Sequence, residues 1–121
     1  MFKKMAAFLF LILTFNSLAF AELTQGDGRK TVSTAGTAEA LSSTALSFTE
    51  VTICAETDNT GVIVVGTSPV ASLSTREGVY LAAGDCYTIS TSENKTGTLD
   101  TINLDTTVNG DGVTYHYFLQ R

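Results

Sequence analysis

Residue types that build many functional sites are scarce in this chain of 121 residues. It has no tryptophan, one proline, one histidine and two cysteines. One histidine and two cysteines without a CxxC motif do not supply the usual ligands of a zinc site. No GxSxG motif marks a serine nucleophile. The sequence therefore predicts no metal and no cofactor, and it favours a non-enzymatic protein.

Basic residues are also few, and two of the seven precede residue 22. Seven Lys and Arg stand against twelve Asp and Glu in the whole chain. Without residues 1–21, five basic residues remain against all twelve acids, which gives a net charge of 5 − 12 = −7. Such a chain has no basic stripe for a nucleic-acid backbone. An anionic membrane surface would repel it as well, so neither nucleic acid nor membrane is an expected partner of the mature chain.

The apolar run near the N-terminus is too short to cross a membrane. It covers Ala6–Leu13, and a membrane helix needs about 20 apolar residues. Two lysines precede the run, and the small residues of Ala19-Phe20-Ala21 lie directly before Glu22. This layout is typical of a secretory signal peptide, so we expect cleavage after residue 21 and export to the periplasm or the medium. An uncleaved membrane tether is the alternative.

After residue 21 the sequence has features typical of β-strands and almost no helical periodicity. Threonine and valine, which favour extended backbone, are frequent. Residues 49–56 alternate, with Val51, Ile53 and Ala55 on one face, and residues 113–119 alternate in the same way. Residues 62–65 are apolar on both faces, so we expect both to be covered, by the domain core or by a neighbouring subunit.

Two turns rich in Asp, Asn and Gly separate these strands. Asp58–Gly61 follows residues 49–56, and Asn109–Gly112 precedes residues 113–119. Both patterns are typical of tight chain reversals, so we expect each turn to close a β-hairpin. A further strand is expected over residues 99–108, centred on Ile102 and Leu104.

Short strands at this spacing, without intervening helices, predict an all-β fold. We expect one small antiparallel β-sandwich of about six or seven strands, immunoglobulin-like or jelly-roll-like. A closed small barrel is the alternative. The expected organisation is a signal peptide over residues 1–21, a flexible leader over residues 22–34, and the sandwich domain over residues 35–121.

The two cysteines are expected to form one disulfide bond. Cys54 and Cys86 both lie on the polar faces of expected strands, over residues 49–56 and 86–90. In an immunoglobulin-like order these strands are neighbours, and a bond is possible if the Cα atoms lie within about 7 Å. An even pair of cysteines in an oxidising compartment favours this bond, with two free thiols as the alternative.

The remaining candidates for chemistry have ordinary structural interpretations. His116 alternates with Tyr115 and Tyr117, which predicts a solvent-facing histidine on a strand rather than a general base. The acids at turns and strand ends are expected to support turns, because no DxDxD loop marks a calcium site. The tyrosines are expected in packing, and a glycan partner has no support without tryptophan. The acids are Asp58, Asp85, Asp105 and Asp111, and the tyrosines are Tyr80, Tyr87, Tyr115 and Tyr117.

The order of the motifs resembles small structural proteins of tailed-phage virions. In those proteins a strand, an Asn-Thr-Gly turn and a second strand ending in Val-Gly recur together, as they do in residues 51–66. Further matching segments follow in the same order: Gly78–Leu81, Ala83–Asp85, Ile102–Asp105 and Val108–Val113. The resemblance covers residues 36–119 and consists of turn and core positions.

This resemblance implies a compact β-sandwich on the head, neck or surface of a particle. It implies a structural role through protein–protein contacts, with self-association or other virion proteins as partners, and no catalytic residue. The alternative function is an exported periplasmic or cell-surface domain that binds a glycan or a protein.

Overall fold

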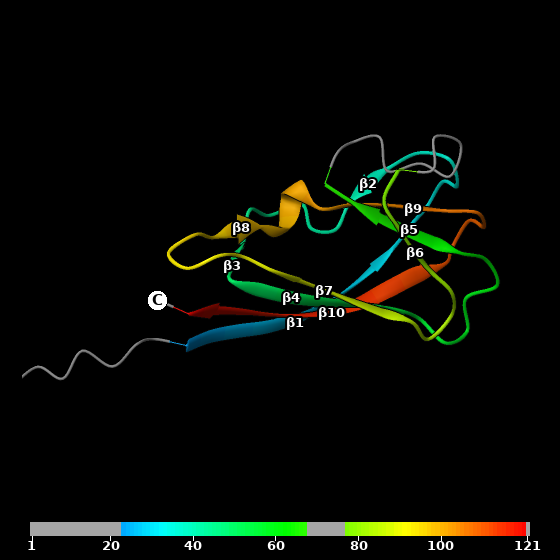
Figure 1. Cartoon of the computed structure of the whole chain (residues 1–121). Coiled ribbons are helices and arrows are strands. Elements are labelled where there is room, and N and C mark those ends of the chain that lie inside the picture. The colour runs from blue at the N-terminus through cyan, green and yellow to red at the C-terminus, as the bar shows by residue number, and fades with distance from the viewer. Residues whose placement is uncertain (1–22, 68–76, 121) are drawn as a thin grey trace, which may run out of the picture.

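The fold is almost entirely β-structure. The computed structural model describes residues 23–67 and 77–120 (Figure 1). In these residues the chain forms ten strands and one 3₁₀ turn, Leu99–Thr101. The strands are β1 Leu23–Thr31, β2 Glu39–Ala40, β3 Ser47–Phe48, β4 Glu50–Ala55, β5 Ile63–Gly66, β6 Val79–Leu81, β7 Cys86–Ser90, β8 Gly97–Thr98, β9 Asn103–Thr106 and β10 Gly112–Gln120. Three of the ten, β2, β3 and β8, have only two residues, which leaves seven longer strands.

The strands form two four-stranded antiparallel sheets and a two-stranded ribbon. The first, called sheet A here, has the order β1-β10-β4-β7, and sheet B has the order β2-β9-β5-β6. Strands β3 and β8 form the ribbon. The two large sheets lie in separate layers (Figure 1), and the buried apolar side chains of both meet between them. The predicted all-β antiparallel sandwich is confirmed.

Alternation along the strands of sheet A decides which side chains enter the core. In β4, Val51 and Ile53 are 0 % exposed, and Ala55 is buried with them. In β10, Val113 and Leu119 are buried, and Tyr115 and Tyr117 between them pack against the hydrophobic core. The predicted core faces of both strands are therefore confirmed.

Strand β5 is buried on both faces, as its sequence predicted. Ile63 and Val65 join the core between the sheets, while Val64 lies on the opposite face of sheet B. All three are at most 1 % exposed. The chain itself covers both faces, so this strand does not need a neighbouring subunit.

The prediction of a flexible leader over residues 22–34 is wrong. Leu23–Thr31 form β1, which pairs with β10 over nine consecutive residues. Gly26 and Gly28 suit this strand because Tyr117 and Tyr115 lie across them. A Cβ atom would lie 2.5 Å from the hydroxyl of Tyr117 in the first case and 2.2 Å from that of Tyr115 in the second. The glycines therefore make room for aromatic rings, and the sandwich domain begins at β1.

The two predicted hairpins are also wrong, because each turn joins one sheet to the other. Asp58–Gly61 leads from β4 in sheet A to β5 in sheet B, and Asn109–Gly112 leads from β9 in sheet B to β10 in sheet A. The expected strand over residues 99–108 is shorter than predicted, since a 3₁₀ turn precedes β9. Turn chemistry fixes where the chain reverses but not which strands then pair.

The two crossing turns contact each other. The Asn59 amide group accepts a hydrogen bond from Gly112 N (2.9 Å) and donates one to Gly112 O (2.8 Å). The Asp111 carboxylate accepts hydrogen bonds from Thr60 N (3.2 Å) and Gly61 N (2.7 Å). These four bonds tie the two crossing turns to each other.

Replacing Asn59 with alanine is expected to lower the free energy of unfolding by about 1–3 kcal/mol, because the buried N–H of Gly112 loses its acceptor. Urea unfolding followed by circular dichroism measures this change. Asn103→Ala is the matched control, since its amide makes one exposed bond of 3.4 Å to Thr101 O. Equal effects of the two substitutions would contradict the role given to Asn59.

Candidate functional site

Sheet A turns one face away from the core, and this face carries His116, Cys54 and Cys86. The pairing register aligns its side chains in three rows across the four strands. The rows, in the order β1-β10-β4-β7, are Gln25-Phe118-Glu50-Ser90, Asp27-His116-Thr52-Thr88 and Arg29-Thr114-Cys54-Cys86. We call this surface the outer face of sheet A.

His116 lies on the outer face, as predicted, and it has a partner there. Its Nδ1 atom is in hydrogen-bond contact with the carboxylate of Asp27 on β1. The ring of Phe118 lies edge-on to the imidazole, with ring centroids 4.6 Å apart. The sequence did not reveal Asp27 because β1 was expected to be a leader. Glycines two residues apart in β1 and tyrosines two residues apart in β10 were the signal for this pairing.

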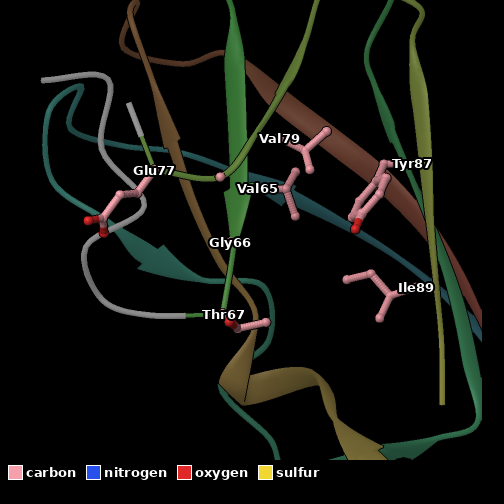
Figure 2. Close-up of a pocket in the computed structure, with 8 residues that line it drawn as sticks. Val65, Gly66, Thr67, Glu77, Val79, Tyr87 and Ile89 are labelled. Carbon is pink, nitrogen blue, oxygen red and sulfur yellow. The ribbon is translucent and has the colours of Figure 1, made fainter. Parts of the chain in front are cut away.

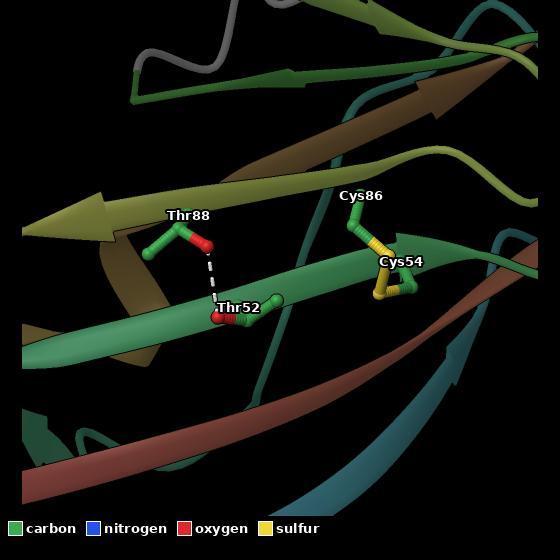
Figure 3. Close-up of a disulfide and its surroundings, with 4 residues drawn as sticks. All are labelled: Thr52, Cys54, Cys86 and Thr88. Carbon is green, nitrogen blue, oxygen red and sulfur yellow. Dashed lines mark hydrogen bonds between the residues drawn. A yellow bond between two sulfur atoms is a disulfide. The ribbon is translucent and has the colours of Figure 1, made fainter.

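The predicted disulfide bond between Cys54 and Cys86 is confirmed. It joins β4 to β7, with the two Cα atoms 4.0 Å apart. In the next row, the hydroxyl groups of Thr52 and Thr88 form a hydrogen bond of 2.9 Å (Figure 3). Two adjacent side-chain pairs therefore fasten the edge strand β7 to the sheet. The bond is compatible with an oxidising, exported environment.

An ion pair on this face links β1 to the end of β4. The Arg29 guanidinium group on β1 binds both carboxylate oxygens of Glu56, with Nη2 at 3.0 Å from Oε2. The hydrogen bond from Arg29 lowers the pKa of Glu56, and the same bond raises the pKa of Arg29. Glu56 directly follows β4, so the pair reaches over β10 and helps to hold β1 in place.

A second ion pair fixes the turn after β1. Glu39 accepts a bond of 2.9 Å from Lys30 Nζ through one oxygen, and its other oxygen accepts from Ser33 N (2.6 Å) and Thr34 N (3.2 Å). Burial raises the pKa of Glu39, but the bonds from Lys30 and the two backbone groups outweigh it, so the pKa is lowered overall. Charge on Glu39 therefore stabilises the folded chain.

Stability is expected to fall at acidic pH because of these two carboxylates. Their pKa values in the folded chain lie below the ordinary value of 4.5, so the unfolded chain takes up protons first as the pH falls. Their contribution is present above pH 4.5 and is lost as the pH falls through the lowered values. Urea unfolding from pH 7 to pH 3 measures this loss. The double variant Glu39→Gln/Glu56→Gln should lose less stability on acidification than Glu93→Gln, whose side chain is exposed in a loop.

The polar groups of the outer face are engaged with each other rather than directed at a common point. Asp27 contacts His116, Arg29 binds Glu56, and Glu50 accepts a bond from Ser90 at 3.1 Å. Both cysteines are consumed by the disulfide bond. Within the described ranges, no group of three or more His, Cys, Asp or Glu side chains could hold a metal ion. This arrangement suits a contact surface.

The acids at turns are dispersed over the fold. Asp85 accepts a bond of 3.0 Å from Ala82 N, and Asp111 holds the crossing turns. Asp105 is 0 % exposed, and its Oδ1 atom accepts bonds from Gly36 N and Thr106 N, each at 2.8 Å. Its Oδ2 atom has no hydrogen-bond partner among the described residues. Each of these three acids thus supports a local turn or loop.

An apolar groove opens where the edges of the two sheets face each other. Its volume is about 340 Å³, and it is lined by Val65 and Val79 from sheet B and by Tyr87 and Ile89 from sheet A (Figure 2). Glu77 and Thr67 also line it. The volume is near the lower end of the range for small-molecule sites.

The four tyrosines do not form one platform for a sugar ring. Tyr115 and Tyr117 face the core side of sheet A and cover the glycines of β1, with ring centroids 6.5 Å apart. Tyr87 lines the groove, and Tyr80 is 42 % exposed on the opposite face of sheet B, beside Val64. Tyr87, Tyr115 and Tyr117 pack against the core, as predicted, whereas Tyr80 does not.

The chain was also compared with known proteins. In the described residues, no helix is long and apolar enough to cross a membrane. No protein-family model matches the chain, and neither the curated proteins nor the solved structures contain a significant match.

Proposed function

We propose that the mature chain is a non-enzymatic structural module that acts through protein–protein contacts, of the kind found on the surface or neck of tailed-phage particles. The observation that carries this proposal is the outer face of sheet A. Its charged side chains are each paired with a neighbour, and a disulfide bond fastens its edge strand. A rigid polar face of this kind offers a partner a fixed pattern of charges and hydrogen-bonding groups.

The proposal includes export of the chain. The disulfide bond supports it, because such bonds persist in oxidising compartments and are rare in the cytosol. The start of β1 supports it as well, since Leu23 lies two residues after the expected cleavage point. Cleavage after Ala21 would leave the whole described domain intact.

Mass spectrometry of native particles tests this proposal. Particles are purified from the source of the gene, and the N-terminus of this chain is identified in them. We expect the chain in the particles, starting at Glu22. Recovery of the chain only from the periplasmic or secreted fraction, without particles, would contradict the virion role.

The second candidate function is an exported binding domain, and the apolar groove favours it. Tyr87, Ile89 and Val79 offer a surface that could receive an apolar ligand group or a side chain of a protein. This function predicts that Tyr87→Ala abolishes binding of a ligand recovered with the periplasmic protein, while Tyr80→Ala on the far face of sheet B leaves binding unchanged.

A further inference from the structure

Strand β1 is the one long edge strand of the two large sheets in the described part of the chain. Sheet A ends at β1 and β7, and sheet B ends at β2 and β6. β2 has two residues, β6 three and β7 five, whereas β1 has nine. Proteins protect exposed edges by keeping them short, by placing charged side chains on them, or by a proline or a bulge. Of these devices β1 has only charged residues, and they have both signs, Asp27 against Arg29 and Lys30. β1 contains no proline, and its register with β10 is uninterrupted.

The outward side of β1 has no partner among the described residues. Its backbone pairs with β10 on one side, and no other described group bonds to the main chain of residues 24–31. The turn that follows is different, because Val32, Ser33 and Thr34 all donate their N–H groups to acceptors within the chain. The unpaired backbone groups are therefore confined to β1 itself.

The side chains of β1 limit the kind of partner that fits this edge. Gly26 and Gly28 have no side chains, and the charged groups of Asp27 and Arg29 are 80 % and 63 % exposed on the outer face. The described side chains of β1 thus include no apolar anchor for the pocket of a partner. A second strand, held by main-chain bonds and matched charges, fits this surface.

We propose that β1 pairs antiparallel with β1 of a second copy of this chain, around a two-fold axis at Gly28. Sheet A of one copy and sheet A of the other would then form one continuous sheet of eight strands. Opposite residues of antiparallel strands point to the same side of a sheet, so residues of the outer face must lie opposite residues of the outer face. This requires the two-fold axis to pass through a residue of β1 rather than between two residues. Centring on Asp27 or on Arg29 places like charges opposite each other. Centring on Gly28 places Asp27 opposite Arg29 of the second copy, and symmetry makes this contact twice.

This inference rests on the proposed function and adds the partner, which is a second copy. One strand pair buries less surface than a stable dimer needs, so we expect a weak, concentration-dependent dimer in solution. Many weak contacts acting together can still hold copies side by side on a particle.

A charge-exchange experiment tests the register. In Asp27→Arg both positions of the contact become positive, and in Arg29→Asp both become negative. Each variant alone should self-associate at least about tenfold more weakly than the parent, because like charges then oppose each other. A mixture of the two variants should associate as well as the parent, since each contact then joins an arginine of one variant to an aspartate of the other.

The matched controls are Glu93→Arg and Lys95→Asp. These residues have the same spacing and exposure in a loop, and the substitutions change net charge by the same amounts. Analytical ultracentrifugation of residues 22–121, from about 10 µM to about 1 mM, measures association over the weak range expected for such a contact. Circular dichroism checks that every variant is folded.

Hydrogen exchange on the unmodified chain gives a second measurement that needs no substitution. Amides in β1 should become protected as the concentration rises, while those of β7 should not. A parent that stays monomeric over the whole range overturns the proposal, as do single variants that associate like the parent or a mixture that does not associate. A monomeric chain that is still found in particles would overturn this inference alone and leave the proposed function standing.

Discussion

Replacing Cys54 and Cys86 together with serine is expected to lower the free energy of unfolding by about 3–4 kcal/mol. The two residues are 32 positions apart, and the loss of their link restores the conformational freedom of a loop of that size to the unfolded chain. A domain of this size has a stability of about 5–15 kcal/mol, so the loss is a large part of the total. Urea unfolding at neutral pH, with and without reductant, measures it.

The neighbouring row of the same strands provides the control for this variant. Thr52→Ala/Thr88→Ala also changes one cross-strand pair between β4 and β7, but it removes a single exposed hydrogen bond. We expect a loss of about 1 kcal/mol or less from this control. The disulfide prediction fails if the serine variant and the parent unfold at the same urea concentration. It also fails if the denatured, unreduced parent contains two free thiols.

Replacing Ile53 with alanine is expected to lower the free energy of unfolding by about 2–5 kcal/mol. Ile53 is 0 % exposed at the centre of sheet A, where its cross-strand neighbours are Tyr115 and Tyr87. Truncation removes buried apolar surface and leaves a cavity that the surrounding strands fill only in part. Urea unfolding followed by tyrosine fluorescence measures the change.

Ile53→Val and Thr52→Ala are the control substitutions for this prediction. The valine variant should cost about 0.5–1.5 kcal/mol, because only one methylene group is lost. Thr52 lies next to Ile53 but on the outer face, so its truncation should cost far less. Similar losses for Thr52→Ala and Ile53→Ala would mean that the faces of β4 are assigned the wrong way round.

The faces of the strands could be predicted from the sequence because they depend on local alternation. Val51, Ile53 and Ala55 are buried as their spacing indicates, and Cys54 projects to the other side as expected. The disulfide bond was predicted from the same alternation, together with the assumption that the two strands are neighbours in one sheet. Period-two alternation requires no knowledge of distant segments.

Strand pairing could not be predicted in the same way, because it depends on contacts between distant segments. Asp58–Gly61 and Asn109–Gly112 have the composition of hairpin turns, yet each connects two different sheets. Their preference for crossing the sandwich comes from bonds that Asn59 and Asp111 make to the opposite turn. Local turn chemistry contains no signal for such a contact.

For a related reason, the sequence did not show that Asp27 and Arg29 belong to the candidate site. Two glycines in β1 indicate a weak strand when they are considered alone, since glycine adds flexibility and packs nothing. They support pairing only together with Tyr115 and Tyr117, whose rings occupy the vacant positions. Asp27 and Arg29 could therefore not be placed on the outer face before β10 was known to be their neighbour.

The partnership of β1 with β10 has a consequence for the order of folding events. Leu23 lies opposite Gln120, so the pair joins the two ends of the described chain. Folds dominated by such distant contacts form in milliseconds to seconds rather than in microseconds. A ribosome makes β1 early and β10 late, and in the meantime β1 has neither its neighbour nor the tyrosine rings that cover its glycines. During synthesis β1 thus has no place in the sheet until β10 has emerged.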